Sequence, residues 1–305
     1  MRVVSLLPSG TEIVAALGAL ENLVGVTHEC DYPAVVGSRA RVTRSAVDGA
    51  AAPGNVDARV SELLSSGASL YTMDEPRIAA LRPDVIITQA LCDVCAVTEA
   101  DVRALAARLA PSPAIITVSG GTLEGVFEDI ARVAAALHMV DEGEELLAGL
   151  RARKRAVHDR LAQHNAPRPR VAVIEWTDPN YAAGHWVPEM VRRAGGTDVL
   201  ARAGERSVVV SANQVRDADP EVILVAPCGY SARRAHDSAR VMLAREEWSW
   251  ARGRRVWAVD ANGLVSRPGP RLVDGIELFA RIFNPSLFSP IDDSHALAVG
   301  AGRAA

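Results

Sequence analysis

Two related stretches of sequence decide the fold: Arg82-Pro83-Asp84-Val85-Ile86-Ile87 and, in the second half of the chain, Asp219-Pro220-Glu221-Val222-Ile223-Leu224. Each places a proline and an acidic residue before three aliphatic residues, a pattern typical of a loop that leads into a buried strand. The repeat predicts two similar α/β halves in one chain. Because the carboxyl ends of strands face the binding crevice in open α/β sheets, we expect the functional site there.

Length and composition are those of an ordinary globular protein with room for two domains: 305 residues, 49% hydrophobic and 23% charged. The net charge of −4 gives no reason to expect nucleic acid or an anionic membrane surface as a partner. Lys154 is the single lysine, which argues against mechanisms that need a lysine Schiff base or a P-loop lysine. No apolar stretch reaches the roughly 20 residues of a membrane helix, so no membrane insertion is expected.

The N-terminal sequence bears on the compartment. Residues 1–7 run directly into Pro8 and Ser9, without a basic region, a signal-length apolar run or a small-residue cleavage site. We therefore expect a cytoplasmic protein, or a periplasmic or extracellular one if a leader has been removed. In a reducing compartment the four cysteines are expected to be thiols or metal ligands rather than disulfides.

Strand and helix patterns predict the domain organisation. Buried strands are expected at residues 3–7, 23–27, 85–89, 115–118, 171–176, 222–226 and 255–259. Ser9 and Glu12 have the spacing of a capping box and predict a helix with Ser9 as its N-cap. Residues 141–164 predict one helix about 36 Å long, with a single stripe formed by Leu146, Leu150, Val157 and Leu161.

These elements predict an α/β fold with two Rossmann-like lobes, a single long helix between them and a ligand cleft between the lobes. The N-terminal lobe is expected over residues 1–140, the connecting helix over 141–165 and the C-terminal lobe over 166–288. Residues 289–305, with an Asp-Asp-Ser run and an Ala/Gly-rich end, are expected to be a disordered tail.

Six stretches of local sequence occur in order over roughly residues 1–285: RVVSLLPSGTE (2–12), GVTHECDYP (25–33), LRPDVI (81–86), DPNYAAG (178–184), AGG (194–196) and SRPGPR (266–271). In this set the chain resembles the cobalamin-binding branch of the class III periplasmic-binding-protein-like fold. The resemblance implies a binding protein rather than an enzyme, which holds a corrinoid such as cobalamin between its lobes as a carrier, a sensor or a transporter-associated solute-binding protein. An ABC transporter is the partner that the family implies, and the chain is expected to be a monomer.

By position in these motifs, the resemblance assigns Tyr32, Trp176, Tyr181 and Arg267 to the wall of the ligand pocket. A corrin is a broad, mostly apolar ring with an amide fringe, which suits flat aromatic walls and a few side-chain donors. His185 and Trp186 lie just before a predicted helix and are further candidates for ligand binding. For His185 the alternative is a bond to a backbone carbonyl, and for Trp186 it is packing within the lobe.

The cysteines allow three hypotheses. All four follow strand-like runs, and the C-x-x-C spacing of two of them is that of half a zinc or iron-sulfur site; they are Cys30, Cys92, Cys95 and Cys228. They could pack as small buried thiols, form a shared metal or cluster site at the cleft mouth, or supply an axial ligand to cobalt. His28 and His185 are candidate cobalt ligands as well.

A third class of function is an enzyme that acts on a corrinoid or another tetrapyrrole, with Cys95 as nucleophile or cobalt ligand. Glu175 and Glu189 are candidate catalytic carboxylates, but no partner base or nucleophile accompanies them in the sequence. Three tryptophans near the last strand are expected to pack in the core or on the surface: Trp248, Trp250 and Trp257.

Overall fold

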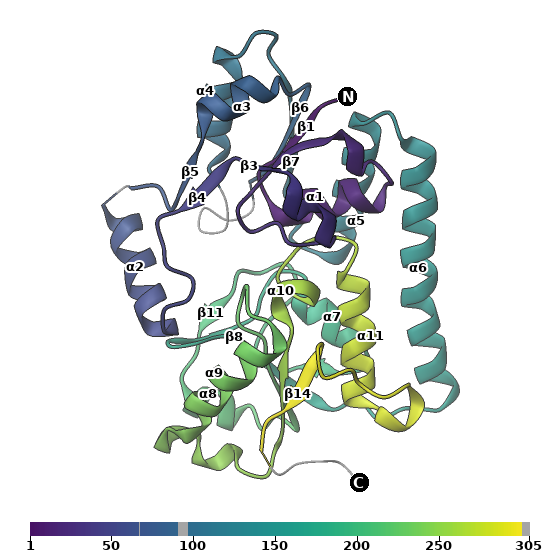
Figure 1. Cartoon of the computed structure of the whole chain (residues 1–305). Helices are drawn as coiled ribbons and strands as arrows, with labels where there is room; N and C mark the ends of the chain where they lie inside the picture. The colour runs from purple at the N-terminus through teal and green to yellow at the C-terminus, as the bar shows by residue number, and fades with distance from the viewer. Residues whose placement is uncertain (67, 91–96, 301–305) are drawn as a thin grey trace. The chain divides into compact units, whose positions relative to one another are not determined.

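The computed structural model describes residues 1–66, 68–90 and 97–300, which form two compact α/β units (Figure 1). Unit 1 comprises Met1–Gly120 and Glu124–Gly149, and unit 2 comprises Gly121–Leu123 and the chain from Leu150 onward. The chain passes from unit 1 to unit 2 within helix α6 (Val140–Gln163), which confirms the long helix predicted from the sequence.

Unit 1 is built on a five-stranded parallel sheet with the strand order β3-β2-β1-β6-β7. Its strands are β1 (Val3–Ser5), β2 (Leu23–Val26), β3 (Ala40–Arg41), β6 (Val85–Gln89) and β7 (Ala114–Val118). A separate antiparallel pair joins β4 (Thr43–Ser45) to β5 (Tyr71–Met73). The central strands β1 and β6 are buried along their whole length, which explains their continuous apolar runs.

The helices of unit 1 are α1 (Pro8–Ala16), α2 (Pro53–Ser65), α3 (Glu75–Leu81), α4 (Glu99–Arg108) and α5 (Leu123–Ala136), with 3₁₀ turns η1 (Leu20–Asn22) and η2 (Ala34–Ser38). The predicted capping box at the start of α1 is wrong. Leu7 is the N-cap, no side chain caps the helix, and Pro8 begins it because the fixed φ of proline suits the first helical turn. Ser9 and Glu12 are consequently inside the helix and buried.

Unit 2 contains a seven-stranded sheet with the order β11-β9-β8-β12-β13-β14, and β10 also pairs with β8. Its strands are β8 (Arg170–Thr177), β9 (Asn180–Ala182), β10 (Thr197–Asp198), β11 (Val208–Val209), β12 (Val222–Val225), β13 (Arg255–Val259) and β14 (Ala296–Ala298). The core strands β10, β8, β12 and β13 are parallel, whereas β9, β11 and β14 run antiparallel to their neighbours.

The helices of unit 2 are α7 (Val187–Arg193), α8 (Ala212–Asp217), α9 (Ala232–Ala244), α10 (Ala261–Leu264) and α11 (Leu272–Phe283), with 3₁₀ turns η3 (Glu246–Ala251) and η4 (Pro285–Leu287). The prediction of a disordered tail is wrong for residues 289–300. Strand β14 pairs with β13, Ala296 in the strand is fully buried, and Val299 just after it is 6% exposed. Residues 301–305 lie outside the described part of the chain.

The repeated stretch has the same structure in both units, which confirms the predicted similarity of the two halves. Arg82 and Asp219, its first residues, both have left-handed backbone conformations, with φ of 46° and 44°. Asp84 accepts from the backbone N–H of Arg2 at 2.7 Å, and Glu221 accepts from that of Arg170 at 2.8 Å. The acidic residue of each repeat therefore fastens the start of the strand beside it, β1 in unit 1 and β8 in unit 2.

The second part of α6 is anchored within unit 2. Arg153 forms ion pairs with Asp274 and Glu277 on α11, and these carboxylates raise its pKa above the ordinary arginine value. Leu150 and Val157, two members of the predicted stripe, are buried. Within the described residues, no helix is long and apolar enough to cross a membrane.

Candidate functional site

In unit 1, the turn after β2 carries the polar residues of the candidate site, and Arg41 fixes this turn. Nη1 of Arg41 donates to the carbonyl oxygens of Thr27 and Cys30 at 2.7 and 2.6 Å. The backbone N–H of Glu29 donates to Thr27 Oγ1 at 3.1 Å. These hydrogen bonds hold the backbone on both sides of His28 and Glu29, so the turn keeps the two residues in a fixed position.

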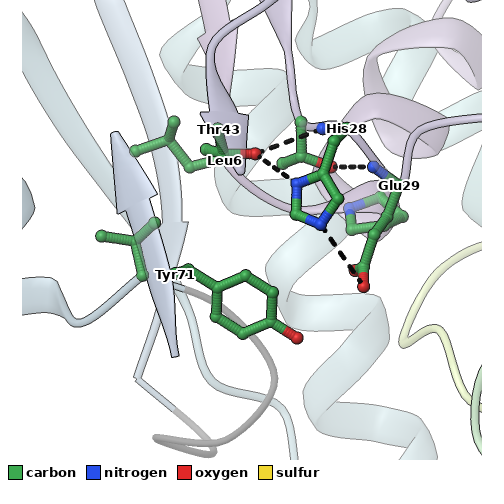
Figure 2. A pocket seen from close by; sticks show the side chains of 8 residues that line it. Leu6, His28, Glu29, Thr43 and Tyr71 are labelled. Carbon is green, nitrogen blue, oxygen red and sulfur yellow. Dashed lines mark hydrogen bonds and ion pairs between the residues drawn. The ribbon is translucent and has the colours of Figure 1, made fainter. Parts of the chain in front are cut away.

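His28 is the central side chain of this turn (Figure 2). Its Nδ1 lies 2.8 Å from Thr43 Oγ1, and its backbone N–H donates to the same hydroxyl oxygen at 3.2 Å. Its ring lies 5.8 Å from that of Tyr71, centroid to centroid. Burial, and to a smaller degree the charge of Arg41, lowers the pKa of His28, which favours the neutral imidazole.

A small pocket adjoins this imidazole, lined by Leu6, Pro8, Thr27, His28, Glu29, Thr43, Tyr71 and Val97. Its volume is about 10 Å³, which is room for roughly one water molecule. The pocket can therefore receive a single polar group, but it cannot enclose a macrocycle.

Cys30 is buried at the end of the same turn. Its Sγ lies 3.1 Å from Thr11 Oγ1 and 3.3 Å from Thr27 Oγ1, and the residue is 1% exposed. These contacts support the packing hypothesis for this thiol.

The four-cysteine metal site stays a prediction. Cys92 and Cys95 lie outside the described residues, and Cys228 is an exposed residue of unit 2. Among the residues that the structure describes, no group of three or more His, Cys, Asp and Glu side chains could hold a metal ion.

In unit 2, an aromatic surface forms where β8 ends. Trp176 on β8 and Tyr181 on β9 are direct cross-strand partners, and Tyr181 pairs in turn with Val209 on β11. Directly opposed residues of antiparallel strands project on the same face, so these three side chains form one row across the sheet. The row ends on an exposed residue, because Val209 is 58% exposed.

Tyr230, which follows β12, is a buried residue that packs against Trp176. Its ring meets that of Trp176 edge to face at 5.5 Å, and the guanidinium of Arg234 on α9 lies 3.6 Å above its centre. Burial raises the pKa of the Tyr230 phenol, which keeps the ring neutral. Tyr230 is only 3% exposed and belongs to the core of unit 2, so it supports Trp176 without presenting a face to solvent. We call Trp176, Tyr181 and Val209 the aromatic surface.

His185 and Trp186 follow β9 but differ in their surroundings. His185 has a left-handed φ of 54°, held by bonds from its N–H to the Glu205 carbonyl at 2.6 Å and from the Gly204 N–H to its own carbonyl at 2.9 Å. Burial and the nearby Arg206 lower its pKa. Trp186 is only 6% exposed, and its indole N–H donates to the Val265 carbonyl at 2.8 Å. These contacts favour packing for Trp186, and the ligand contacts of both residues stay predictions.

Arg267 is buried to all but 8%, and its guanidinium donates to Asn262 Oδ1 at 2.8 Å. In unit 1, Tyr32 is 48% exposed, as a residue that meets a ligand can be. The roles assigned to these two residues stay predictions.

The other candidates are engaged in structural contacts. Glu189 accepts from the backbone N–H of Leu123 at 2.8 Å and from Arg192 at 3.0 Å, so both carboxylate oxygens have structural partners. The backbone carbonyl of Glu175 accepts from the Cys228 N–H at 3.1 Å, and the role of the Glu175 carboxylate stays a prediction. Trp248 and Trp250 stack at 5.6 Å against the core of unit 2, which confirms packing for this pair.

Sequence reasoning missed Tyr230, Arg234, Arg41, Thr43 and Tyr71. A signal existed for Tyr230, because it lies two residues beyond Cys228 at the carboxyl end of the repeated strand. No comparable signal marked the others. Thr43 and Tyr71 meet His28 only because β4 and β5 pair outside the main sheet.

Comparison with known proteins identifies the family. A family model described as "Periplasmic binding protein" matches residues 3–252. The chain belongs to the periplasmic binding protein family. A vitamin B12-binding protein of Vibrio cholerae serotype O1 is 24% identical to this periplasmic binding protein over 277 residues, which cover 90% of this chain and 86% of the relative.

Solved structures confirm the fold of this periplasmic binding protein. A periplasmic heme binding protein from Pseudomonas aeruginosa superposes with a TM-score of 0.73 at 21% identity, over 99% of each chain. The periplasmic vitamin B12 binding protein of Vibrio cholerae superposes with a TM-score of 0.64 at 22% identity, over 93% of this chain and 97% of that one. The predicted fold class and family are thus confirmed.

Proposed function

We propose that this periplasmic binding protein binds a corrinoid such as cobalamin. We propose that the corrin ring binds against the aromatic surface of unit 2. The observation that carries this proposal is the cross-strand row of Trp176 and Tyr181, in which Trp176 packs on the buried Tyr230 at a ring distance of 5.5 Å. Such a row offers a broad apolar face with a few polar atoms at its rim, which matches a corrin and its amide fringe. The vitamin B12-binding relative, aligned over 90% of this chain, supports the same ligand class.

The position of the surface supports the proposal as well. It lies where β8 and β12 end, the edge at which open α/β sheets bind ligands. The row reaches an exposed residue at Val209, so a planar ligand can approach it from solvent. Arg234 supplies a cation beside Tyr230, suited to an amide oxygen or an anionic group at the ligand edge.

Heme is the second candidate. A solved protein that covers 99% of this chain is named a periplasmic heme binding protein. A porphyrin is also flat and apolar, and the aromatic surface suits both macrocycles. The difference lies at the rim, because heme carries carboxylates where a corrin carries mostly neutral amides.

Parallel titrations distinguish the two ligands. Hydroxocobalamin and hemin are added separately to the purified protein, and the visible spectrum and the heat of binding are recorded. The proposal expects saturation by hydroxocobalamin at one site per chain. Saturation by hemin alone would replace the corrinoid with a porphyrin, and no response to either would overturn the proposal.

We further propose that the protein acts without catalysis, as a carrier, a sensor or the solute-binding component of an ABC transporter. Membership of the periplasmic binding protein family supports a binding role. The predicted cytoplasmic location fits a carrier or a sensor, whereas a solute-binding component of a transporter would act outside the cytoplasm. Fractionation of cells that produce the full-length gene product would distinguish these roles.

A further inference from the structure

We propose that His28 gives the ligand a hydrogen bond from its Nε2–H, received by an oxygen at the ligand's edge, and that His28 does not ligate the metal at the ligand's centre. The identity of the ligand rests on the proposed function. The state of the imidazole rests only on contacts within unit 1, and can be measured without a ligand.

The hydroxyl of Thr43 fixes the tautomer. Its oxygen accepts the backbone N–H of His28 at 3.2 Å and lies 2.8 Å from Nδ1 of the same residue. Since Thr43 Oγ1 already accepts one hydrogen bond from His28, we infer that the hydroxyl donates its own proton to Nδ1 of His28, which lies 2.8 Å away. Nδ1 therefore accepts, and the neutral ring carries its proton on Nε2.

Nε2–H is then a donor with no acceptor in the described part of the chain. The atom is buried and makes no hydrogen bond there, and Glu29 Oε1 at 3.9 Å is too distant for one (Figure 2). A buried donor without an acceptor is costly. An incoming oxygen acceptor would relieve that cost, which makes His28 a point of recognition.

The size of the adjoining pocket decides which part of a ligand can reach Nε2. With about 10 Å³, it admits one water-sized atom, such as the oxygen of an amide at the corrin edge. Imidazole ligation would bring a metal to about 2.0 Å from the nitrogen, with the whole macrocycle around it. The pocket is lined by Leu6, Pro8 and Val97 among others, and it is too small to enclose a macrocycle.

The first test needs no ligand. Nitrogen-15 NMR of the histidine rings, with His28 assigned from the His28→Gln spectrum, should show Nδ1 unprotonated and Nε2 protonated in the neutral form. Thr43→Ser keeps the hydroxyl and should preserve this state, whereas Thr43→Val should allow the other tautomer to appear. A proton on Nδ1 in the wild-type protein would overturn the proposal.

The second test uses hydroxocobalamin, with hemin as the alternative probe. Gln places an amide donor near the position of Nε2, so His28→Gln should bind within about threefold of the wild type. His28→Phe removes the donor and should bind about five- to tenfold more weakly, as expected for one hydrogen bond. Both variants should give the same bound-state absorption bands as the wild type, because His28 does not touch the metal.

A shift of the metal-dependent bands in His28→Phe, or equal affinity in all three proteins, would overturn the proposal. If the wild-type protein binds neither probe, the proposed function fails and the ligand half of this proposal fails with it. The tautomer is then still decided by the first test, so the two failures are distinguishable.

Discussion

The two units begin their central strands in the same way and end them differently. At the amino ends, Arg2 is held by Asp84 in unit 1 and Arg170 by Glu221 in unit 2, with donor–acceptor distances of 2.7 and 2.8 Å. At the carboxyl ends, unit 1 presents the polar His28 turn, whereas unit 2 presents the aromatic surface around Trp176.

This difference separates scaffold from function. The repeated stretch positions the start of each strand, and both units share its proline, its acidic residue and its three aliphatic residues. The loops after the strands are free to differ, because they lie at the edge of the sheet where we propose that the ligand binds. One residue departs from this pattern: Asp198 lies beside Val171 at the start of β8, where unit 1 has the buried Leu23 beside Val3.

The largest expected effect concerns Asp198. Burial raises its pKa to about 6 despite backbone donors from Leu200 and Ala201, and its Oδ2 is buried without a partner among the described residues. A carboxyl whose pKa is higher in the folded protein stabilises it below pH 3.8 and loses that contribution as the pH rises through about 6. The loss should be at most about 3 kcal/mol.

Urea unfolding of the wild type and Asp198→Asn at several pH values from 4 to 7.5 measures this effect. Asn keeps an oxygen for the two backbone donors but cannot ionise. The wild type should lose stability relative to the variant as the pH rises. If the free energy of unfolding of the two proteins changed with pH in parallel, the ionisation of Asp198 would not destabilise the fold.

The next largest effect concerns ligand affinity and the aromatic surface at the carboxyl end of β8. Trp176→Ala removes one member of the aromatic surface and should weaken corrinoid binding by roughly 1 to 3 kcal/mol, the range for a buried aromatic anchor. Trp250→Ala is the matched control, because Trp250 packs beside Trp248 in the same unit. Isothermal titration of both folded variants checks this. An equal loss of corrinoid affinity in the two variants would show that Trp176 at the end of β8 has no specific role in binding.

The smallest effect tests the similarity of the amino ends. Asp84→Ala and Glu221→Ala each remove one hydrogen bond between a carboxylate and a backbone N–H at a partly exposed site, so each should lower the free energy of unfolding by about 1 kcal/mol. Ligand affinity should not change. Denaturant unfolding and ligand titration of both variants check this. A loss of affinity in either variant, or a loss of stability in only one, would contradict the equivalence of the two amino ends.

Much of the fold was predictable from local pattern. The buried parallel strands showed as apolar runs after Pro-Asp and Pro-Glu, and the stripe containing Leu150 and Val157 marked α6. Strand β14 was not predicted because it has only three residues, and its pairing with β13 is a long-range contact that no local sequence pattern indicates. Pro8 displaced the predicted cap of α1 because proline itself starts a helix.

The site was predictable only in part. Trp176 and Tyr181 lie close in sequence, and their pairing follows from the tight turn between β8 and β9. Tyr230 and Arg234 join them through β12, which pairs with β8 from about 50 residues away. The partnership of His28 with Thr43 depends on where β4 leaves the main sheet, which a sequence pattern does not specify.

The central claim is that the aromatic surface of unit 2 seats a corrinoid ring. Calorimetric titration of hydroxocobalamin into the wild-type protein and Trp176→Ala, with the visible spectrum recorded on the same samples, tests it most directly. The account predicts one site per chain in the wild type and a weaker one in the variant, by roughly 5- to 150-fold. No heat and no spectral change in the wild type at high micromolar hydroxocobalamin, or full affinity in folded Trp176→Ala, would contradict it.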